Sequence, residues 1–359
     1  MLSILLYIVI LLLCNHKSLT ATIRWKHNWD IHYVVKGNGP PLLLVPGFGV
    51  GTFHYEKNID ELSQEYSVYT LDLFGQGKSW PQTIDDIKPE QKLVFSTELW
   101  VEQLEYFIHK IIQKPVHIGG NSLGGYLSVI LASKNPQLIK SISLLNPTPF
   151  WGFFDKKFSS IWNGELPAPQ WALNLGSTYF NSLKSRAVVK TMLNGVYANN
   201  KAFDDKLVND IIVSASHPVG PSAFTSILFA RKEEKEFDDL LESIDIPIQL
   251  IMGKQDPWIV PFWGQRYKRI KPNMPYYEVS PSGHCPNDES PKVVNKILKL
   301  WIDTIEQGKE LELDENFELT SFEDHGVQTS ARILDGSPNP NNLFEIIGEW
   351  VHKIQLANK

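Results

Sequence analysis

One serine of the chain lies between glycine pairs, in the stretch HIGGNSLGGYLSV at residues 117–129. Residues 120–124 fit the pattern G-x-S-x-G, after a short apolar run and before a helical pattern. A strand–turn–helix of this kind holds the serine in a strained turn with its hydroxyl exposed, and the glycines let helix and strand pack closely. Ser122 is therefore a candidate nucleophile, and an incidental serine in a glycine-rich turn is the alternative.

A serine hydroxyl is a weak nucleophile that needs a general base, and the base needs an acid to orient it. Asp256 follows the apolar run IQLIMG, and His284 follows YYEVS in the stretch SPSGHCPNDESP. Serine, then an acid, then histidine is one of the known chain orders of a catalytic triad, with the acid and the histidine on loops after late strands. Asp256 and His284 fit these two positions.

The negative charge that develops in acyl transfer needs hydrogen-bond donors. The backbone N–H of Leu123, next after the serine, is one candidate. The N–H of Phe48 is the other, because PGFGVG supplies small residues and an accessible backbone directly after the apolar run LLLV. These two groups are the predicted oxyanion hole.

The remaining acids and the cysteine near these motifs are expected to have structural roles. Asp288 and Glu289 follow the histidine and are expected to cap a helix that begins near Pro291. Asp72 precedes the nucleophile and is expected to stabilise its loop, and Cys285 is expected to be a packing residue. No His, Cys and acid cluster has metal-ligand spacing, and PGFGVG lacks the Lys-Ser/Thr of a phosphate-binding loop, so we expect no metal and no cofactor.

The elements that must position these residues alternate along the chain. The alternating stretch IHYVVKG predicts a strand at 31–37, and apolar runs predict strands at 42–47, 67–73, 116–120, 141–146, 247–253 and 275–280. Helical spacing at 97–113 and 124–134 lies between them. This pattern predicts an α/β fold with a mostly parallel sheet covered by helices on both faces. A net charge of −6 without a basic cluster argues against nucleic-acid binding.

Two regions interrupt the alternation and set the predicted domains. Residues from about 150 to 243 are mostly helical, rich in aromatic residues, and inserted between two core strands, so they are expected to form a cap above the site. Residues 308–359 form a C-terminal extension of unknown role, with strand patterns at 310–324 and 327–334 and an amphipathic helix at 341–355. The hydrolytic domain is then residues 22–307.

The N-terminus contains the apolar run ILLYIVILLL at residues 4–13. It is shorter than the roughly 20 residues of a membrane span, and Thr20 and Ala21 offer small residues for cleavage. We interpret residues 1–21 as a secretory targeting segment, and an uncleaved signal anchor is the alternative.

At this point the chain is identified by resemblance as an α/β hydrolase, and within that superfamily it resembles the pheophytinases, serine hydrolases of chlorophyll breakdown. The stretches that carry the resemblance are PGFGVGTFHYEKNIDEL, LDLFGQGKS, GNSLGGYLSV, LLNPTPFWGFF, HPVGPSAFTSILFA, GKQDPWIVPFWG and PYYEVSPSGHCPNDESP. The resemblance implies Ser122 as nucleophile, His284 as general base and then acid, and Asp256 as its orienting acid. Pro46 departs from the histidine of many relatives, but the expected donor is a main-chain group.

The resemblance also implies the reaction and the location. The expected substrate is the phytyl ester of pheophytin, a hydrophobic tetrapyrrole, and the expected location is the plastid, reached with a leader unlike the long transit sequences of plastid relatives. Trp151 and Phe154, at the entry to the cap, are candidate pocket residues or hinge residues. Chlorophyll or a lipid ester is an alternative substrate, and loose membrane association would give access to either. A non-catalytic binding protein on the same scaffold is the alternative of a different class.

Overall fold

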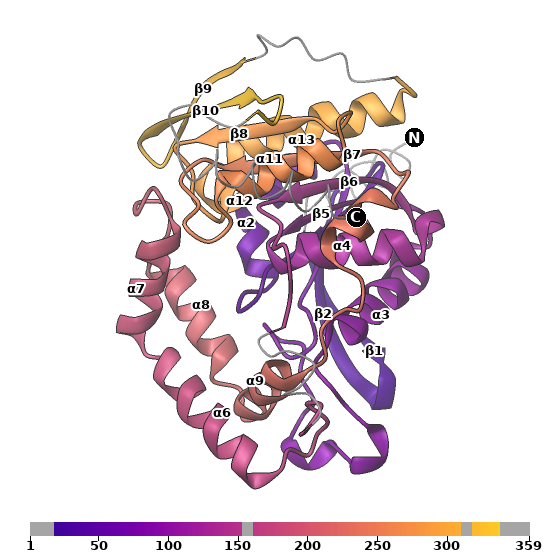
Figure 1. The fold of residues 1–359 in the computed structure, drawn as a ribbon, viewed down its shortest axis with the longest axis vertical. Coiled ribbons are helices and arrows are strands. Elements are labelled where there is room, and N and C mark those ends of the chain that lie inside the picture. Colours follow the sequence, from indigo (N-terminus) through magenta and orange to yellow (C-terminus); the bar gives the residue numbers. More distant parts are fainter. Residues whose placement is uncertain (1–17, 153–160, 310–317, 338–359) are drawn as a thin grey trace, which may run out of the picture.

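The computed structural model describes residues 18–152, 161–309 and 318–337. Within them, strands form a 10-stranded sheet in the order β1-β2-β4-β3-β5-β6-β7-β8-β10-β9 (Figure 1). The strands are β1 (Leu19–Trp25), β2 (Trp29–Lys36), β3 (Pro41–Val45), β4 (Ser67–Leu71), β5 (Val116–Asn121), β6 (Ile139–Leu145), β7 (Ile248–Gly253), β8 (Tyr276–Ser280), β9 (Glu318–Asp324) and β10 (Val327–Ile333). Neighbours from β4 to β8 are parallel, and the outer pairs are antiparallel.

Helices cover both faces of this sheet, because the apolar strands have two faces to bury. On β3, Leu43 and Val45 enter one hydrophobic cluster, whereas Leu42 and Leu44 enter another. The first cluster includes residues of α3 (Thr97–Phe107), α4 (Leu123–Lys134), α10 (Phe237–Glu242) and α11 (Pro261–Ile270), and the second those of α2 (Glu56–Leu62) and α13 (Pro291–Glu306). Alternate side chains of a strand point to opposite faces, so continuous apolar runs fit a sheet buried on both sides. The predicted fold class is confirmed.

The insertion between β6 and β7 is helical, as predicted. Figure 1 shows α6 (Gln170–Leu183), α7 (Arg186–Val196), α8 (Asp205–Ala215) and α9 (Gly220–Phe229) beside the sheet, as a cap. The last helix of the insertion behaves differently, because α10 packs against α4, and Phe237 stacks on Tyr126 with ring centroids 5.5 Å apart. The cap therefore ends at α9, and α10 belongs to the layer that covers the sheet.

The two ends of the described chain join the same sheet. Strand β1 begins at Leu19 and pairs with β2, so the residues expected at a cleavage zone, Thr20 and Ala21, are strand residues, while the apolar run 4–13 lies outside the described residues. At the other end, β10 pairs antiparallel with β8, and the predicted helix 341–355 lies outside the described part. None of the helices in the described ranges combines the length and apolar character needed to cross a membrane.

Candidate active site

Ser122 occupies the sharp turn between β5 and α4. Its backbone has φ 53° and ψ −116°, a conformation that side-chain-bearing residues rarely adopt. A Cβ atom added to Gly120 would lie 2.2 Å from the carbonyl carbon of Gly124, and one added to Gly124 would lie 2.1 Å from the oxygen of Val45. Both positions therefore exclude any side chain. The sequence pattern G-x-S-x-G thus forms the strained strand–turn–helix expected of it.

Asp256 and His284 lie in contact, each on the loop that follows a parallel strand, β7 and β8. His284 Nδ1 is 2.7 Å from Asp256 Oδ2, and the two residues are only 4% and 3% exposed. Burial by itself would raise the pKa of Asp256, but the hydrogen bond and charge of His284 and the N–H groups of Ile259 and Trp258 outweigh it and lower the pKa. The carboxylate stays ionised beside the imidazole.

Asn146, which follows β6, fixes the orientation of that carboxylate. Its Nδ2 donates to Asp256 Oδ2 at 2.6 Å, while its Oδ1 accepts from the N–H of Gly253 at 2.9 Å. The N–H groups of Trp258 and Ile259 donate to Asp256 Oδ1 at 2.8 and 3.0 Å. Both carboxylate oxygens of Asp256 therefore accept hydrogen bonds from groups that the fold holds in place. Sequence analysis did not select Asn146, although its position after a buried strand is the same signal that selected Asp256.

A neighbouring amide ties the histidine to the serine turn. Asn121, directly before Ser122, donates from Nδ2 to the carbonyl oxygen of His284 at 2.9 Å. Across the described part of the chain, no hydrogen bond joins Ser122 Oγ to the imidazole. In a site without substrate this bond is often long, and it tightens when substrate binds. The three predicted residues thus lie around one turn, with the acid–base pair already formed.

The predicted oxyanion donors belong to two segments next to the serine, the start of α4 and the loop after β3. Leu123 is the first residue of α4, so its N–H has no acceptor inside the helix. The loop that carries Phe48 passes beside the turn, because a Cβ on Gly47 would lie 3.4 Å from the Cβ of Ser122. Asp72 braces this loop by accepting from the N–H groups of Thr52 at 2.6 Å and Lys78 at 2.7 Å. The structural interpretation of Asp72 is confirmed.

Aromatic side chains from the core and the cap meet next to the oxyanion loop. The ring of Phe48 lies 5.2 Å from Trp151 and 6.5 Å from Phe224 of α9, and Trp151 also contacts Trp100 at 6.0 Å. A cavity of about 50 Å³ opens here, lined among others by Phe48, Phe180 and Phe224. Its size is far below the roughly 300–1,000 Å³ of ordinary ligand sites. Phe154, the other predicted pocket residue, lies outside the described residues.

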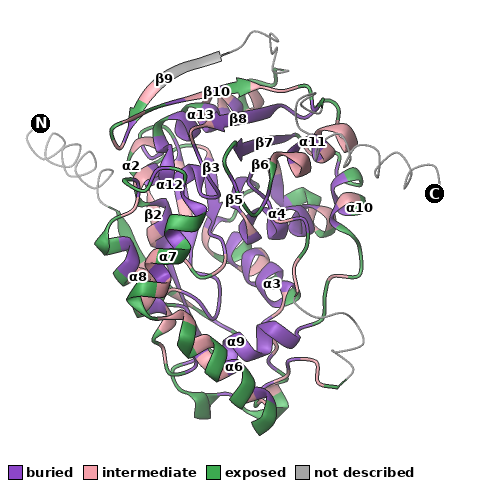
Figure 2. Ribbon diagram, turned by 60° about the vertical axis from the view of Figure 1, so that its left-hand side comes forward, coloured by how far each residue is buried: buried purple, intermediate pink, exposed green. Residues whose placement is uncertain are grey.

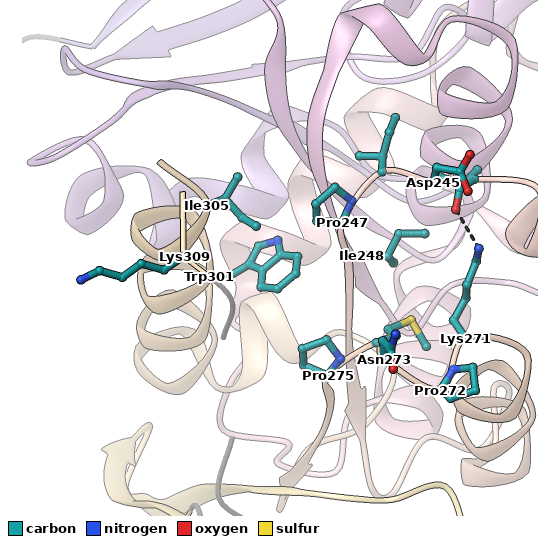
Figure 3. Close-up of a pocket in the computed structure, with 13 residues that line it drawn as sticks. Asp245, Pro247, Ile248, Lys271, Pro272, Asn273, Pro275, Trp301, Ile305 and Lys309 are labelled. Carbon is teal, nitrogen blue, oxygen red and sulfur yellow. Dashed lines mark hydrogen bonds between the residues drawn. The ribbon is translucent and has the colours of Figure 1, made fainter. Parts of the chain in front are cut away.

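Figure 3 shows the residues that line a larger cavity, of about 750 Å³. Its walls come from the residues that precede β7 and β8, with Trp301 and Ile305 of α13, and Lys271 donates to the carbonyl of Ile244 at 2.7 Å. Parallel strands carry their catalytic loops at the carboxyl end, whereas this cavity lies at the amino end. It is therefore separate from Ser122, Asp256 and His284.

The prediction that Asp288 and Glu289 cap a helix is wrong. The residue before α13 is Ser290, and no side chain caps that helix end. Asp288 instead accepts from Tyr197 Oη at 2.9 Å and pairs with Lys57, and Glu289 accepts from main-chain N–H groups of the cap. Both carboxylates are buried, at 4% and 1% exposure, so nearby donors within the protein outcompete a solvent-facing helix end.

The chain is similar in sequence to known proteins over most of its length. A family model described as alpha/beta hydrolase fold matches residues 40–291. Chloroplastic pheophytinase of Arabidopsis thaliana is 36% identical over 79% of this chain and 66% of its own length, so the matched part is just under two thirds of that protein. A human (lyso)-N-acylphosphatidylethanolamine lipase is 27% identical over 74% of this chain and 80% of its own length.

Solved structures show the same fold at lower identity. A protein from Acinetobacter baumannii has a TM-score of 0.64 at 21% identity, covering 81% of this chain and 93% of the other. An esterase from Thermogutta terrifontis has a TM-score of 0.60 at 19% identity, covering 80% and 99%. At these identities the likeness concerns the fold.

Proposed function

The chain belongs to the alpha/beta hydrolase fold family, and from this membership we propose that it is a serine carboxylic ester hydrolase that cleaves the phytyl ester of pheophytin. The observation that carries the hydrolase assignment is the 2.7 Å contact between His284 Nδ1 and Asp256 Oδ2 beside the Ser122 turn. The similarity to chloroplastic pheophytinase supports the choice of substrate, and it supports a plastid location as well.

In the proposed reaction, Ser122 Oγ attacks the ester carbonyl while His284 Nε2 takes the hydroxyl proton. The N–H groups of Leu123 and Phe48 donate to the oxyanion of the tetrahedral intermediate. The intermediate collapses when His284 gives that proton to the departing oxygen, which releases phytol and leaves the acyl group on Ser122. Water, deprotonated by His284, then attacks the acyl-enzyme, and His284 gives this proton to Ser122 Oγ as the acyl–serine bond breaks and pheophorbide is released.

The experiment that tests this proposal compares three esters. Purified protein is incubated with pheophytin, chlorophyll and a p-nitrophenyl ester, and the products are separated by chromatography. Pheophorbide from pheophytin is the expected result. Faster cleavage of chlorophyll, or rapid cleavage of the short ester without any of pheophytin, would contradict the pheophytin assignment. Failure to cleave any ester, together with failure to react with a fluorophosphonate, would favour a binding protein.

The apolar wall for the phytyl chain is proposed to lie between Phe48 and the cap. Phe224→Ala should lower kcat/KM on the phytyl ester about 30-fold, because the phytyl carbons that contact this ring leave water, which is worth about 2 kcal/mol for two or three CH₂ groups. The short ester, which does not reach the cap, should lose less than about threefold. Steady-state kinetics on the two substrates measure the difference.

Trp151→Ala separates a pocket role from a hinge role for Trp151. A selective loss on the phytyl ester would place Trp151 in the pocket wall with Phe224. Its contact with Trp100 of the core also allows a packing role. In that case both esters should be cleaved more slowly by the same factor and Tm should fall. Equal losses for Phe224→Ala would contradict the proposed wall itself.

The outer face of α6 is proposed to contact the lipid surface that holds the substrate. Trp171, Leu175 and Tyr179 follow one another at helical spacing and are 48%, 58% and 54% exposed. Figure 2 shows the exposed outer side of α6, and none of the 14 residues of this helix is charged. Apolar rows with Trp and Tyr suit the interface between water and lipid.

Replacing Trp171 and Leu175 with serine should reduce co-flotation with neutral phosphatidylcholine vesicles several-fold, since two half-exposed apolar side chains would no longer be buried in lipid. Met192→Ser on α7, which is 43% exposed, is the control for loss of any exposed apolar group. Unchanged flotation of the double variant would show that the α6 face does not bind lipid. If light scattering showed a dimer for the wild type and a monomer for the double variant, this face would instead be an interface between two copies of the chain.

A further inference from the structure

The cap touches the main chain of the catalytic histidine itself. The N–H of His284 donates to the carbonyl of Val196, the last residue of α7, at 2.9 Å. A Cβ on Gly283 would lie 2.2 Å from that carbonyl oxygen and 3.0 Å from the nitrogen of Ala198. The connection between α7 and α8 therefore lies directly against the loop that holds the histidine, without room for a side chain between them.

One buried carboxylate joins the two segments. Glu289 belongs to the short helix α12 (Pro286–Glu289) and is 1% exposed. Its Oε1 accepts from the N–H of Gly283 at 2.7 Å, and its Oε2 accepts from the N–H groups of Ala198 at 2.7 Å and Asn199 at 3.1 Å. One oxygen thus holds the residue before the histidine, and the other holds the cap.

The charged and polar side chains near Glu289 have other partners. Lys57 of α2 pairs with Asp288 at 3.0 Å, and Tyr197 of the cap donates to Asp288 at 2.9 Å while its oxygen lies 3.2 Å from His54 Nε2. Cys285 faces the carboxylate from the histidine loop, and His325 reaches Asp288 from the β9–β10 turn.

Burying the carboxylate of Glu289 costs free energy, because it loses its contact with water. Burial raises the pKa of Glu289 to about 7, and the N–H groups of Asn199, Gly283, Ala198 and Cys285 only partly offset it. An apolar residue would fill the same space without burying a charge. What it could not do is accept hydrogen bonds from two segments at once.

We propose that Glu289 is a positioning residue that couples the docking of the cap to the orientation of His284. The proposal rests on the proposed role of His284 in ester hydrolysis. With the cap docked, Glu289 and Val196 hold residues 283 and 284 in place. When the segment at 196–199 moves away, Oε2 loses its donors and the N–H of His284 loses its acceptor, so the histidine loop is released. Hydrolysis is then confined to the state in which the cap covers the site.

Glu289→Gln tests this coupling with nearly the same shape. An amide has one acceptor oxygen, so its NH₂ group must face either the N–H of Gly283 or those of Ala198 and Asn199, and one side of the link is broken. Because small misplacements of a catalytic group reduce rates by up to about 100-fold, we expect kcat on the short ester to fall about 30- to 100-fold with KM changed less than threefold. Labelling of Ser122 by a fluorophosphonate should slow by a similar factor.

Hydrogen exchange supplies a readout that does not depend on turnover. Peptides that contain residues 196–199 and 282–284 should both exchange faster in Glu289→Gln. Glu278→Gln is the matched control, because Glu278 is also a buried glutamate, 6% exposed, and bonds Arg332 at 2.7 Å away from the cap. This control should keep the wild-type labelling rate and the wild-type exchange of both peptides. If Glu289→Gln does not fold, Ala198→Pro removes one cap N–H and should give the same joint change.

The outcomes separate the inference from the function on which it rests. A wild-type protein that a fluorophosphonate does not label at Ser122 would refute the proposed function. Normal labelling of wild type together with normal labelling of Glu289→Gln would overturn the coupling alone. Equal losses in Glu278→Gln would also overturn it, because they would show a general effect of removing a buried carboxylate.

Discussion

Replacing Ser122 with alanine is expected to lower kcat by roughly 10⁶, because no covalent intermediate can form without the hydroxyl. The residual rate would come from substrate binding and the oxyanion donors. The fold should persist, since alanine keeps the Cβ atom that the turn at φ 53° already accommodates. Chromatographic assay of pheophorbide measures the loss, and circular dichroism measures Tm.

Ser128→Ala is the matched control for Ser122→Ala. Ser128 lies on α4, the helix that follows Ser122, is fully buried, and donates to the carbonyl of Gly124 at 2.7 Å. Loss of this hydroxyl should change stability slightly and leave kcat near the wild-type value. If Ser122→Ala kept more than a few per cent of the activity, the acyl-enzyme mechanism would be excluded.

The second large effect is expected from Asp256→Asn, which should lower kcat by about 10⁴. The Oδ1 of the new amide would accept from Trp258 and Ile259, as the carboxylate does, so its NH₂ would take the place of Oδ2. That group would donate to His284 Nδ1 and force the proton to Nε2. An imidazole with a protonated Nε2 cannot accept the proton of Ser122.

The amide of Asn146 allows structural and catalytic losses to be separated. In Asp256→Asn, two NH₂ groups would face each other where Asn146 Nδ2 now lies 2.6 Å from Asp256 Oδ2. Adding Asn146→Asp restores an acceptor there, while the N–H of Gly253 keeps its own acceptor. The double variant should regain Tm without regaining kcat. Recovery of turnover together with Tm would contradict the tautomer explanation.

The dependence of the stability on pH at acidic values gives a further check on the carboxyl group of Asp256. Because the pKa of Asp256 is lowered in the fold, its ionised form stabilises the protein above the unfolded-state pKa. This contribution is lost only as the pH falls through the lowered value. Asp256→Asn should therefore be less stable at neutral pH, and the difference from wild type should shrink below about pH 4.

The sequence was sufficient to predict Ser122, Asp256 and His284 as one group. Each follows a run of apolar residues, and the carboxyl ends of parallel strands meet at one edge of a sheet. Runs such as LLLV are recognisable because a strand buried on both faces has no polar alternation. The serine turn was equally predictable, since its glycines are required by approaches of 2.1–2.2 Å.

The contacts around that group could not be predicted in the same way. Glu289 bonds main-chain N–H groups of Ala198 and Asn199, and main-chain donors are the same for almost every residue type. Its acidic side chain two residues before Pro291 favoured a helix cap, which is a local interpretation. The true partners lie about 90 residues away in the chain and are brought close only by the folded cap.

The pairing of β10 with β8 has a consequence for any shortened form of the protein. Strand β8 leads into the His284 loop, and its outer side is occupied over Ser330↔Ser280 to Ile333↔Tyr277. A chain that stopped at Gln307, where the hydrolytic domain was expected to end, would leave β8 with a free edge of unpaired N–H and C=O groups. Such an edge recruits strands from other molecules, so self-association would begin at the strand that precedes the catalytic histidine.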